Sequence, residues 1–344
     1  MSKRIVICAD GTWNRPEKDI KKDQPTNVLR FARSIRPMTS DGVGQQVFYD
    51  WGVGSYYDPV VGGATGVGVQ KNIMDCYRYI VQNYEEGDEL YFFGFSRGAY
   101  TVRALCGLIN NCGILKREDS NLIQSAFNLY KRGGKTNKPN GINSLKFRTN
   151  HCHNSKFVKF VGVWDTVGAM GIPLSFLGLF EDKDEFYDNK IGTNVNIARH
   201  ALAIDEKRED FEPTIWSPSS ATDIKQTWFS GVHSDIGGGY MPDSQGLLAS
   251  IPPMRWMACQ AAESGLAFEP HWISNSQSVG IPKLNKSRRT FYRLKKEYLR
   301  PIDHGLGEVL IHKSVKERWD NDLTYRPKNL AAYIKEKGWP IHFE

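Results

Sequence analysis

The sequence has few cysteines for its length, and they are scattered along the chain. Six cysteines are spread over 344 residues, and no two of them have the C-x-x-C spacing. Disulfide scaffolds and zinc ribbons use dense or regularly spaced cysteines, so both are excluded. Cys152 lies between two histidines, which we interpret as incidental rather than as a metal site. We therefore expect buried free thiols in a protein of a reducing compartment.

Long apolar runs are also missing. No segment approaches the ~20 apolar residues that a helix needs to span a bilayer. The first residues, MSKRIVICADGTWN, contain only a short apolar run that ends at Asp10, unlike a signal peptide. Internal repeats and low-complexity linkers are missing as well. The sequence predicts a soluble, cytoplasmic protein.

The charge balance is mildly basic. Lys and Arg number 45 against 38 Asp and Glu, which gives a net charge of +7. This excess favours peripheral contact with an anionic membrane, although dispersed surface lysines without a special partner explain it equally well. No arginine-rich arm occurs and the aromatic residues do not alternate with a basic stripe, so nucleic-acid binding is not expected. The oligomeric state stays open.

Apolar, β-rich runs alternate with segments of helical periodicity along the whole chain. The predicted strands are residues 4–9, 46–51, 89–93, 157–164 and 227–232. The predicted helices are residues 26–35, 69–83, 100–110, 122–130, 194–205, 247–264 with a break at Pro252-Pro253, and 330–337, and residues 133–154 are predicted to be a loop. This alternation predicts an α/β fold around a mostly parallel central sheet flanked by helices. We expect one domain of residues 1–344, with a catalytic core at about 3–265 and a C-terminal extension at about 266–344.

A glycine-flanked serine occurs between a predicted strand and a predicted helix. Gly94-Phe95-Ser96-Arg97-Gly98 matches the G-x-S-x-G pattern, with ELYFF before it and AYTVRALCGLI after it. Strand, sharp turn and helix in this order are what a nucleophile elbow requires. The two glycines avoid collisions across the turn, and the serine hydroxyl is presented at the start of a helix. We interpret Ser96 as a nucleophile rather than as a helix cap.

A serine nucleophile needs a base, and the base needs an acid that orients it. Asp165 follows the apolar run that ends in Val163-Trp164, and His233 follows the strand that ends in Gly231-Val232. Ser, Asp and His in this chain order are typical of α/β-hydrolases. The sequence therefore predicts a triad of Ser96, Asp165 and His233. His304 and His312 are the alternative bases, and His200 and Asp205 are kept for other roles.

Five motifs together resemble one known family. They are CADGTWN at residues 8–14, GFSRGAY around Ser96, VWDTVG around Asp165, HALAIDEKR at residues 200–208, and GVHSDIGGGY around His233. This set is similar to the α/β-hydrolase domain of the type VI secretion phospholipase effectors and their uncharacterised relatives. The resemblance covers about residues 5–265. It implies a Ser-Asp-His esterase or lipase that acts on phospholipid acyl esters, and it leaves secretion without a signal peptide open.

The expected chemistry is acyl transfer through an acyl-enzyme. The backbone N–H of Arg97 is predicted to be one donor of the oxyanion hole, and Gly11 or Thr12 after the first strand is the candidate for the second. Asp10 and Asp235 are expected to support the site by accepting backbone N–H bonds. The apolar residues 170–180, MGIPLSFLGLF, either line an acyl-chain pocket or touch a membrane, or else pack into the core. No cofactor is expected.

Two other functions remain open at this point. Asp10, Asp165, His233 and Asp235 all follow predicted strands, so they could instead gather a divalent ion in a metal-dependent phosphoester hydrolase. The D-x-D-G-T motif of the phosphoaspartate phosphatases is excluded, because Cys8 occupies the position of the nucleophilic aspartate. The third function is a non-catalytic binding module with a hydrolase fold, which the presence of all three triad residues argues against.

Overall fold

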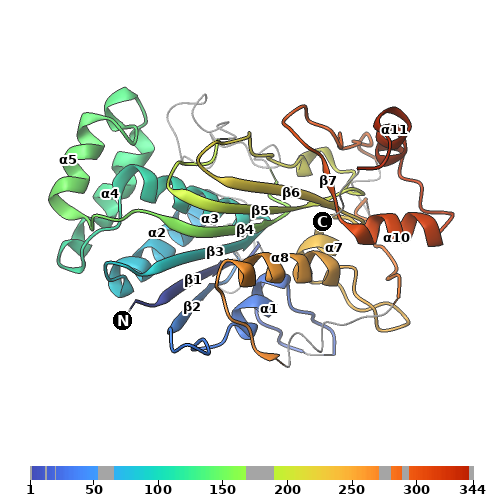
Figure 1. The fold of residues 1–344 in the computed structure, drawn as a ribbon, viewed down its shortest axis with the longest axis horizontal. Coiled ribbons are helices and arrows are strands. Elements are labelled where there is room, and N and C mark those ends of the chain that lie inside the picture. The colour runs from blue at the N-terminus through green and yellow to red at the C-terminus, as the bar shows by residue number, and fades with distance from the viewer. Residues whose placement is uncertain are drawn as a thin grey trace.

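The computed structural model describes residues 2–11, 14–19, 21–52, 66–167, 190–270, 280–288 and 294–340. Its centre is a seven-stranded sheet with the order β2-β1-β3-β4-β5-β6-β7, in which every neighbouring pair is parallel (Figure 1). The strands are β1 (Arg4–Ala9), β2 (Gln45–Asp50), β3 (Glu89–Phe95), β4 (Val158–Trp164), β5 (Val195–Ala203), β6 (Asp223–Phe229) and β7 (Leu310–Ile311). The expected α/β fold is confirmed.

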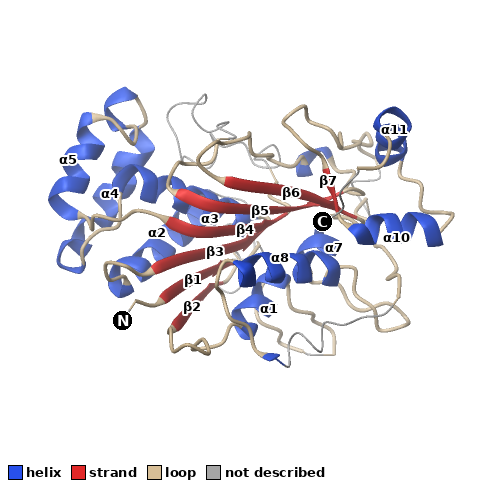
Figure 2. Cartoon of the chain, viewed as in Figure 1, coloured by secondary structure: helices blue, strands red, loops and turns tan. Residues whose placement is uncertain are grey.

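Helices cover both faces of this sheet (Figure 2). One face packs against α1 (Asn27–Ser34) and α8 (Ile251–Glu263), with the short α7 (His233–Gly237) beside α8. The other face packs against α2 (Gly66–Asn83) and α3 (Arg97–Cys112), and α4 (Ile123–Arg132) packs on these two helices. The remaining helices are α5 (Ile142–His151), α10 (Lys313–Asn321), α11 (Lys328–Lys337) and the 3-10 turns Arg117–Leu122, Lys135–Asn137 and Glu209–Phe211.

The central strands are buried on both faces. From Ile5 to Ala9 every residue of β1 is buried, and the same is true of β3 from Leu90 to Phe95. A parallel sheet between two helical layers exposes neither face, so its strands are continuously apolar rather than alternating. These runs were recognisable in the sequence for that reason.

The prediction of a helix over residues 194–205 is wrong, because Val195–Ala203 forms β5. This segment contains three alanines and its apolar residues also fit a helical period, so local propensity favours a helix. Its six residues from Ala198 to Ala203 are all buried between β4 and β6. Burial on both faces of the sheet decides the conformation over local propensity.

Further differences concern three helices and one strand. Residues 133–154 are not a loop throughout, since α5 forms there with Ser144 as its buried residue, and such a solvent-facing helix leaves no apolar stripe in the sequence. Pro252 and Pro253 do not interrupt α8 but lie in its first turn, where their missing N–H groups cost nothing. The helix α10 and the strand β7 were not predicted.

The residues after 300 are packed onto the sheet. β7 pairs with Thr227 and Trp228 of β6, and α10 contacts β6. A third apolar cluster joins Leu202, Ile204 and Trp228 from the sheet side to Ile302 and Ile311 from the C-terminal side. None of the helices in the described ranges combines the length and the hydropathy that crossing a membrane demands.

Candidate active site

Three of the predicted site residues lie at the carboxyl edge of the sheet, toward the end where α7 is seen in Figure 1. Ser96 follows β3, Asp165 follows β4 and His233 begins α7 shortly after β6. Phe95 and Trp164 are partners in the register of β3 and β4, and the Ser96 N–H donates to the Trp164 carbonyl at 3.2 Å. Ser96 and Asp165 therefore leave the sheet side by side, where ligands bind in open α/β sheets.

Ser96 adopts a strained backbone conformation, with φ 56° and ψ −121°. The turn around it is so tight that a Cβ on Gly94 would lie 2.4 Å from the Gly98 carbonyl oxygen. A positive φ at a residue with a side chain costs free energy and persists only where the surrounding structure imposes it. Strand, strained serine and helix follow each other as a nucleophile elbow requires.

The imidazole of His233 is bound to the carboxylate of Asp165. The distance from His233 Nδ1 to Asp165 Oδ2 is 2.6 Å, and both side chains are buried. The ring centroid of Phe95 lies 4.6 Å from the imidazole centroid and that of Phe211 lies 4.9 Å from it, so two aromatic rings pack against the imidazole. Among the hydrogen bonds of the described residues, none joins Ser96 Oγ to His233.

Asp165 is held as a carboxylate. Burial alone would raise its pKa, but the charge of Arg300 and the hydrogen bond with His233 outweigh burial and place the pKa well below the usual range. An ionised carboxylate accepts hydrogen bonds only, so the proton of the 2.6 Å contact belongs to His233 Nδ1. The other ring nitrogen, Nε2, is then the one that can accept a proton.

Arg300 is a site residue that the sequence analysis missed. Its Nη1 donates to Asp165 Oδ1 at 2.7 Å and its Nη2 donates to Asp165 Oδ2 at 3.0 Å. The side chain is fully buried and arrives from the C-terminal part of the chain. A lone arginine in a basic, loop-rich tail gives no sequence signal for such a contact.

Glu206 is a second residue that was missed. Its Oε2 accepts the backbone N–H of His233 at 3.2 Å, and both of its oxygens accept from the Arg208 guanidinium at 2.9 Å. Burial would raise the pKa of Glu206, but the Arg208 hydrogen bonds lower it to about 2. Both residues lie within the HALAIDEKR motif, which was the available signal.

Gly11 lies beside the serine, as a second oxyanion donor must. A Cβ on Gly11 would come within 3.1 Å of Ser96 Cβ. Asp10 Oδ1 accepts the Gly11 N–H at 2.7 Å, and its other oxygen accepts from Thr26 Oγ1 at 2.6 Å and Tyr49 OH at 2.7 Å. Thr12 lies outside the described residues. Arg97 is the first residue of α3, so its N–H lies at the positive end of the helix dipole.

Asp235 ties the start of α7 to a distant loop. Its Oδ2 accepts the N–H of Val232 at 3.0 Å and that of Asn285 at 3.1 Å, while Oδ1 accepts from Asn285 Nδ2 at 2.7 Å. Burial raises the pKa of Asp235, and these hydrogen bonds oppose the shift. Its oxygens are thus occupied by protein groups next to His233.

The alternative histidines have other contacts. His200 Nε2 accepts the Thr166 N–H at 3.1 Å, and burial lowers the pKa of His200 to about 3. His312 caps α10, where its Nδ1 accepts the Ser314 N–H at 3.2 Å. His304 stacks on Trp228 with 6.2 Å between the ring centroids.

The residues named for a divalent ion are separately engaged. Asp10 accepts from two hydroxyl groups, Asp165 is paired with Arg300, and Asp235 is bound to Asn285. Within the part of the chain that the structure describes, no three His, Cys, Asp or Glu side chains converge as a metal site requires.

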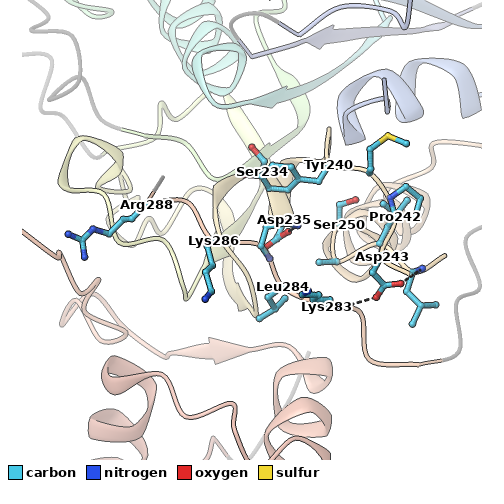
Figure 3. A pocket seen from close by; sticks show the side chains of 15 residues that line it. Ser234, Asp235, Tyr240, Pro242, Asp243, Ser250, Lys283, Leu284, Lys286 and Arg288 are labelled. Carbon is cyan, nitrogen blue, oxygen red and sulfur yellow. Dashed lines mark hydrogen bonds between the residues drawn. The ribbon is translucent and has the colours of Figure 1, made fainter. Parts of the chain in front are cut away.

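A cavity of about 870 Å³ begins at Ser234 and Asp235, directly after His233 (Figure 3). Its lining includes the apolar side chains of Met241, Leu247 and Leu284 and the ring of Tyr240, together with Lys283, Asn285 and Lys286. Asp243 accepts the Lys283 N–H at 2.9 Å and so joins the two segments that line the cavity (Figure 3). The apolar residues 170–180, which were considered for an acyl-chain pocket, lie outside the described residues.

The parallel sheet, the strained serine after β3 and the buried His–Asp pair define the class as an α/β-hydrolase-like protein. A family model described as "T6SS, Phospholipase effector Tle1-like, catalytic domain" matches residues 3–260. The chain belongs to this family, as its motifs suggested.

Individual relatives are distant. The chain is 25% identical over 240 residues to an uncharacterized protein of Saccharomyces cerevisiae, YEL023C, which is 63% of this chain and 33% of that protein. A solved structure of an uncharacterized protein from Pseudomonas aeruginosa is similar with a TM-score of 0.46 and 17% identity over 79% of this chain and 47% of that one.

Two further solved structures are similar at a lower level. The Tle1 effector bound to the VgrG spike of the type VI secretion system gives a TM-score of 0.39 and 18% identity over 71% of this chain and 52% of that one. A metagenomic carboxyl esterase gives 0.35 and 10% identity over 76% of each chain. The chain spans between a third and about half of the yeast protein, the Pseudomonas aeruginosa protein and the Tle1 effector.

Proposed function

We propose that this protein is a serine esterase that cleaves the acyl esters of phospholipids. The observation that carries the proposal is the 2.6 Å contact between His233 Nδ1 and the ionised Asp165, at the sheet edge where the strained Ser96 leaves β3. An aspartate fixes the tautomer of a histidine in this way when the histidine serves as a general base. Membership in the phospholipase effector family supports the phospholipid substrate.

In the proposed reaction, His233 Nε2 takes the proton of Ser96 Oγ as the oxygen attacks the ester carbonyl carbon. The tetrahedral intermediate collapses, the alcohol leaves with the proton from His233, and the acyl group remains on Ser96. Water, deprotonated by the same imidazole, then releases the fatty acid. Contacts between nucleophile and base tighten when substrate binds, so the unliganded site does not need a Ser96–His233 hydrogen bond.

The oxyanion is stabilised, in this proposal, by backbone N–H groups. Arg97 at the start of α3 supplies one of them, together with the positive end of the helix dipole. For the second donor, Gly11 is favoured by its position against Ser96. Asp10 already accepts the Gly11 N–H, so the carboxylate and the oxyanion would compete for it unless Thr12 donates instead.

The cavity beside His233 is proposed to receive part of the lipid. Its apolar lining residues suit hydrocarbon, and Lys283 and Lys286 among them suit an anionic head group. The net charge of +7 supports peripheral contact with an anionic membrane. Delivery by type VI secretion is an expectation from the family description.

The test uses a fluorophosphonate probe, which reacts with activated serines, and vesicles of mixed phospholipids. The wild-type protein should be labelled and should release fatty acid, whereas Ser96→Ala should do neither. Ser220→Ala is the control, since this serine is exposed and lies before β6, away from the carboxyl edge of the sheet, and it should keep its labelling. Fatty-acid release that survives in Ser96→Ala but stops with EDTA would overturn the proposal in favour of a metal-dependent site.

A further inference from the structure

We propose that Arg300 is a positioning residue of the catalytic triad, and that the segment around it completes the active site from outside the family core. The inference rests on the proposed function, because it assigns a role toward the Asp165–His233 pair. The matched family core ends at residue 260, so Arg300 comes from beyond it.

The guanidinium reaches both oxygens of Asp165. It contacts Oδ1 at 2.7 Å and Oδ2 at 3.0 Å, and Oδ1 also accepts the Ala203 N–H at 3.0 Å. The second oxygen is left in contact with His233 Nδ1 at 2.6 Å. A planar guanidinium fits a carboxylate along both oxygens, so it fixes the plane of Asp165 and thereby the direction of the hydrogen bond to His233.

Arg300 is itself held from two sides. Its Nη1 donates to the Ala203 carbonyl at 2.9 Å, and its Nη2 donates to the carbonyl of Phe211, whose ring contacts His233. Its own carbonyl accepts from Asn329 at 3.0 Å. Arg300 thus links β5, through Ala203, to Phe211, whose ring packs against the imidazole of His233.

The segment before Arg300 is attached to the loop after β5 by three side-chain pairs. Lys295 contacts Asp210 at 2.7 Å, Glu297 contacts Lys207 at 2.7 Å, and the Tyr298 hydroxyl donates to Glu212 at 2.8 Å. These pairs involve partly exposed groups and stabilise little individually. Together they hold residues 295–298 along the loop after β5, and this fixes the position from which the Arg300 side chain reaches Asp165.

The charge of Arg300 also acts on the proton of the His–Asp pair. Among the described residues, Glu206 from the loop after β5 interacts with His233, and His200 from β5 interacts with Asp165. Behind them, Arg208 interacts with Glu206, and Arg103 from α3 interacts with His200. The partly exposed Arg208 offsets the charge of the buried Glu206, with its Nε 2.9 Å from Glu206 Oε1. Without Arg300, the site would keep the Asp165 charge with no adjacent cation, and the Asp165–His233 pair would bind its proton more tightly.

The experiment compares Arg300→Met and Arg300→Lys with the wild type by kinetics and by NMR of 15N-histidine-labelled protein. The matched control is Arg199→Met, which removes another buried arginine. Arg199 lies in β5 and pairs with Asp223, the first residue of β6, at the edge of the sheet opposite to the site. Folding is checked by circular dichroism and thermal melting. The His233 signals are assigned by their loss in His233→Gln, and their titration is followed with pH.

For Arg300→Met we expect kcat to fall at least about tenfold with KM within about twofold, because the base is misoriented rather than the substrate lost. The acidic limb of the kcat/KM profile and the NMR midpoint should both move upward by about one pH unit or more. Arg300→Lys keeps the charge but not the two-oxygen contact, so its midpoint should move less while kcat still falls. Arg199→Met should lower the melting temperature and leave both profiles unchanged.

A folded Arg300→Met protein with wild-type kcat and an unmoved midpoint would overturn the inference. If Arg300→Met does not fold, Arg300→Lys decides in the same way through kcat and the orientation-sensitive Nδ1–H signal of His233. If the wild type shows no hydrolysis that depends on Ser96, the proposed function fails, while the NMR titration still tests the placement of Arg300 against the His–Asp pair.

Discussion

Gly98, in the first turn of α3, lies against the carbonyl group of Ala9 at the end of β1. A Cβ on Gly98 would be 2.0 Å from the Ala9 oxygen and 2.6 Å from the Asp10 oxygen. The turn that carries Ser96 leaves β3 and packs directly against the end of β1. Its shape therefore depends on the absence of a side chain at Gly98. This contact explains why glycine is required four residues after Gly94 in the motif.

Gly98→Ala should disturb the serine more than a typical surface change. The backbone of Ala9 cannot move away without moving β1, so we expect the free energy of unfolding to fall by about 1–3 kcal/mol. We also expect the fluorophosphonate probe to label Ser96 more slowly. Urea denaturation and labelling kinetics measure the two effects. Gly44→Ala is the control, because a Cβ there meets nothing closer than Lys3 Cβ at 3.8 Å. Equal behaviour of the two variants would contradict the prediction.

Asp165→Asn should lose activity and stability together. The amide cannot hold the imidazole in the required tautomer, and kcat/KM should fall by a factor on the order of 10⁴. Arg300 would be left as a buried cation without its anion, which should cost about 3–5 kcal/mol of unfolding free energy. The double variant Asp165→Asn with Arg300→Met should recover part of the stability but none of the activity. Additive losses of stability in the double variant would show that the two side chains do not interact.

The stability of the wild type should fall as the pH rises from about 4 to about 6 relative to Asp10→Asn. Burial raises the pKa of Asp10 to about 6, whereas an unfolded aspartate titrates near 3.9. Between these values the folded state keeps a proton that the unfolded chain releases, so rising pH favours unfolding by roughly 3 kcal/mol in total. The asparagine variant lacks this term. Urea titrations at several pH values measure the difference, and parallel profiles for the two proteins would refute it.

Met241→Ala should reduce activity on long-chain esters more than on short-chain ones. Met241 lines the cavity beside His233 and is 46% exposed, so its removal takes away apolar contact with a hydrocarbon chain. We expect kcat/KM for a dodecanoyl ester to fall about 3- to 10-fold, with a smaller change for an acetyl ester, since a few buried methylene groups contribute about 0.8 kcal/mol each. Hydrolysis of p-nitrophenyl esters of both lengths is the measurement.

Met38→Ala is the matched control for this prediction. Met38 is 55% exposed and lies opposite Gly44 at the amino end of β2, at the far edge of the sheet from the site. It should change neither rate. An equal ratio of the two rates in Met241→Ala and wild type would mean that the cavity does not receive the acyl chain.

The strands β1, β3 and β4 were predictable because they are buried on both faces of the sheet and are therefore continuously apolar. The positions of Ser96 and Asp165 directly after strands followed from the same runs. β5 was misread, since its alanines favour a helix locally and only its place between β4 and β6 makes it a strand. The catalytic roles and the single-domain organisation stay predictions.

The partners of Asp165 show why the rest could not be predicted. Arg300 follows Asp165 by 135 positions and lies in a tail whose other basic residues are mostly exposed. No periodicity or spacing distinguishes it from those residues. Glu206, by contrast, lies in a long motif, and its contact with the His233 N–H could have been proposed from that motif.

The shortness of β7 has a consequence for how the molecule behaves in a crowded solution. β7 pairs only with Thr227 and Trp228, so within the described residues the first half of β6 forms a border of the sheet. That border begins with Asp223, which engages Arg199, and it includes Gln226, whose amide binds the backbone of Trp216. An edge with a charged residue and a side chain already hydrogen-bonded to another loop disfavours pairing with a strand of another molecule. It therefore protects the protein against edge-to-edge aggregation.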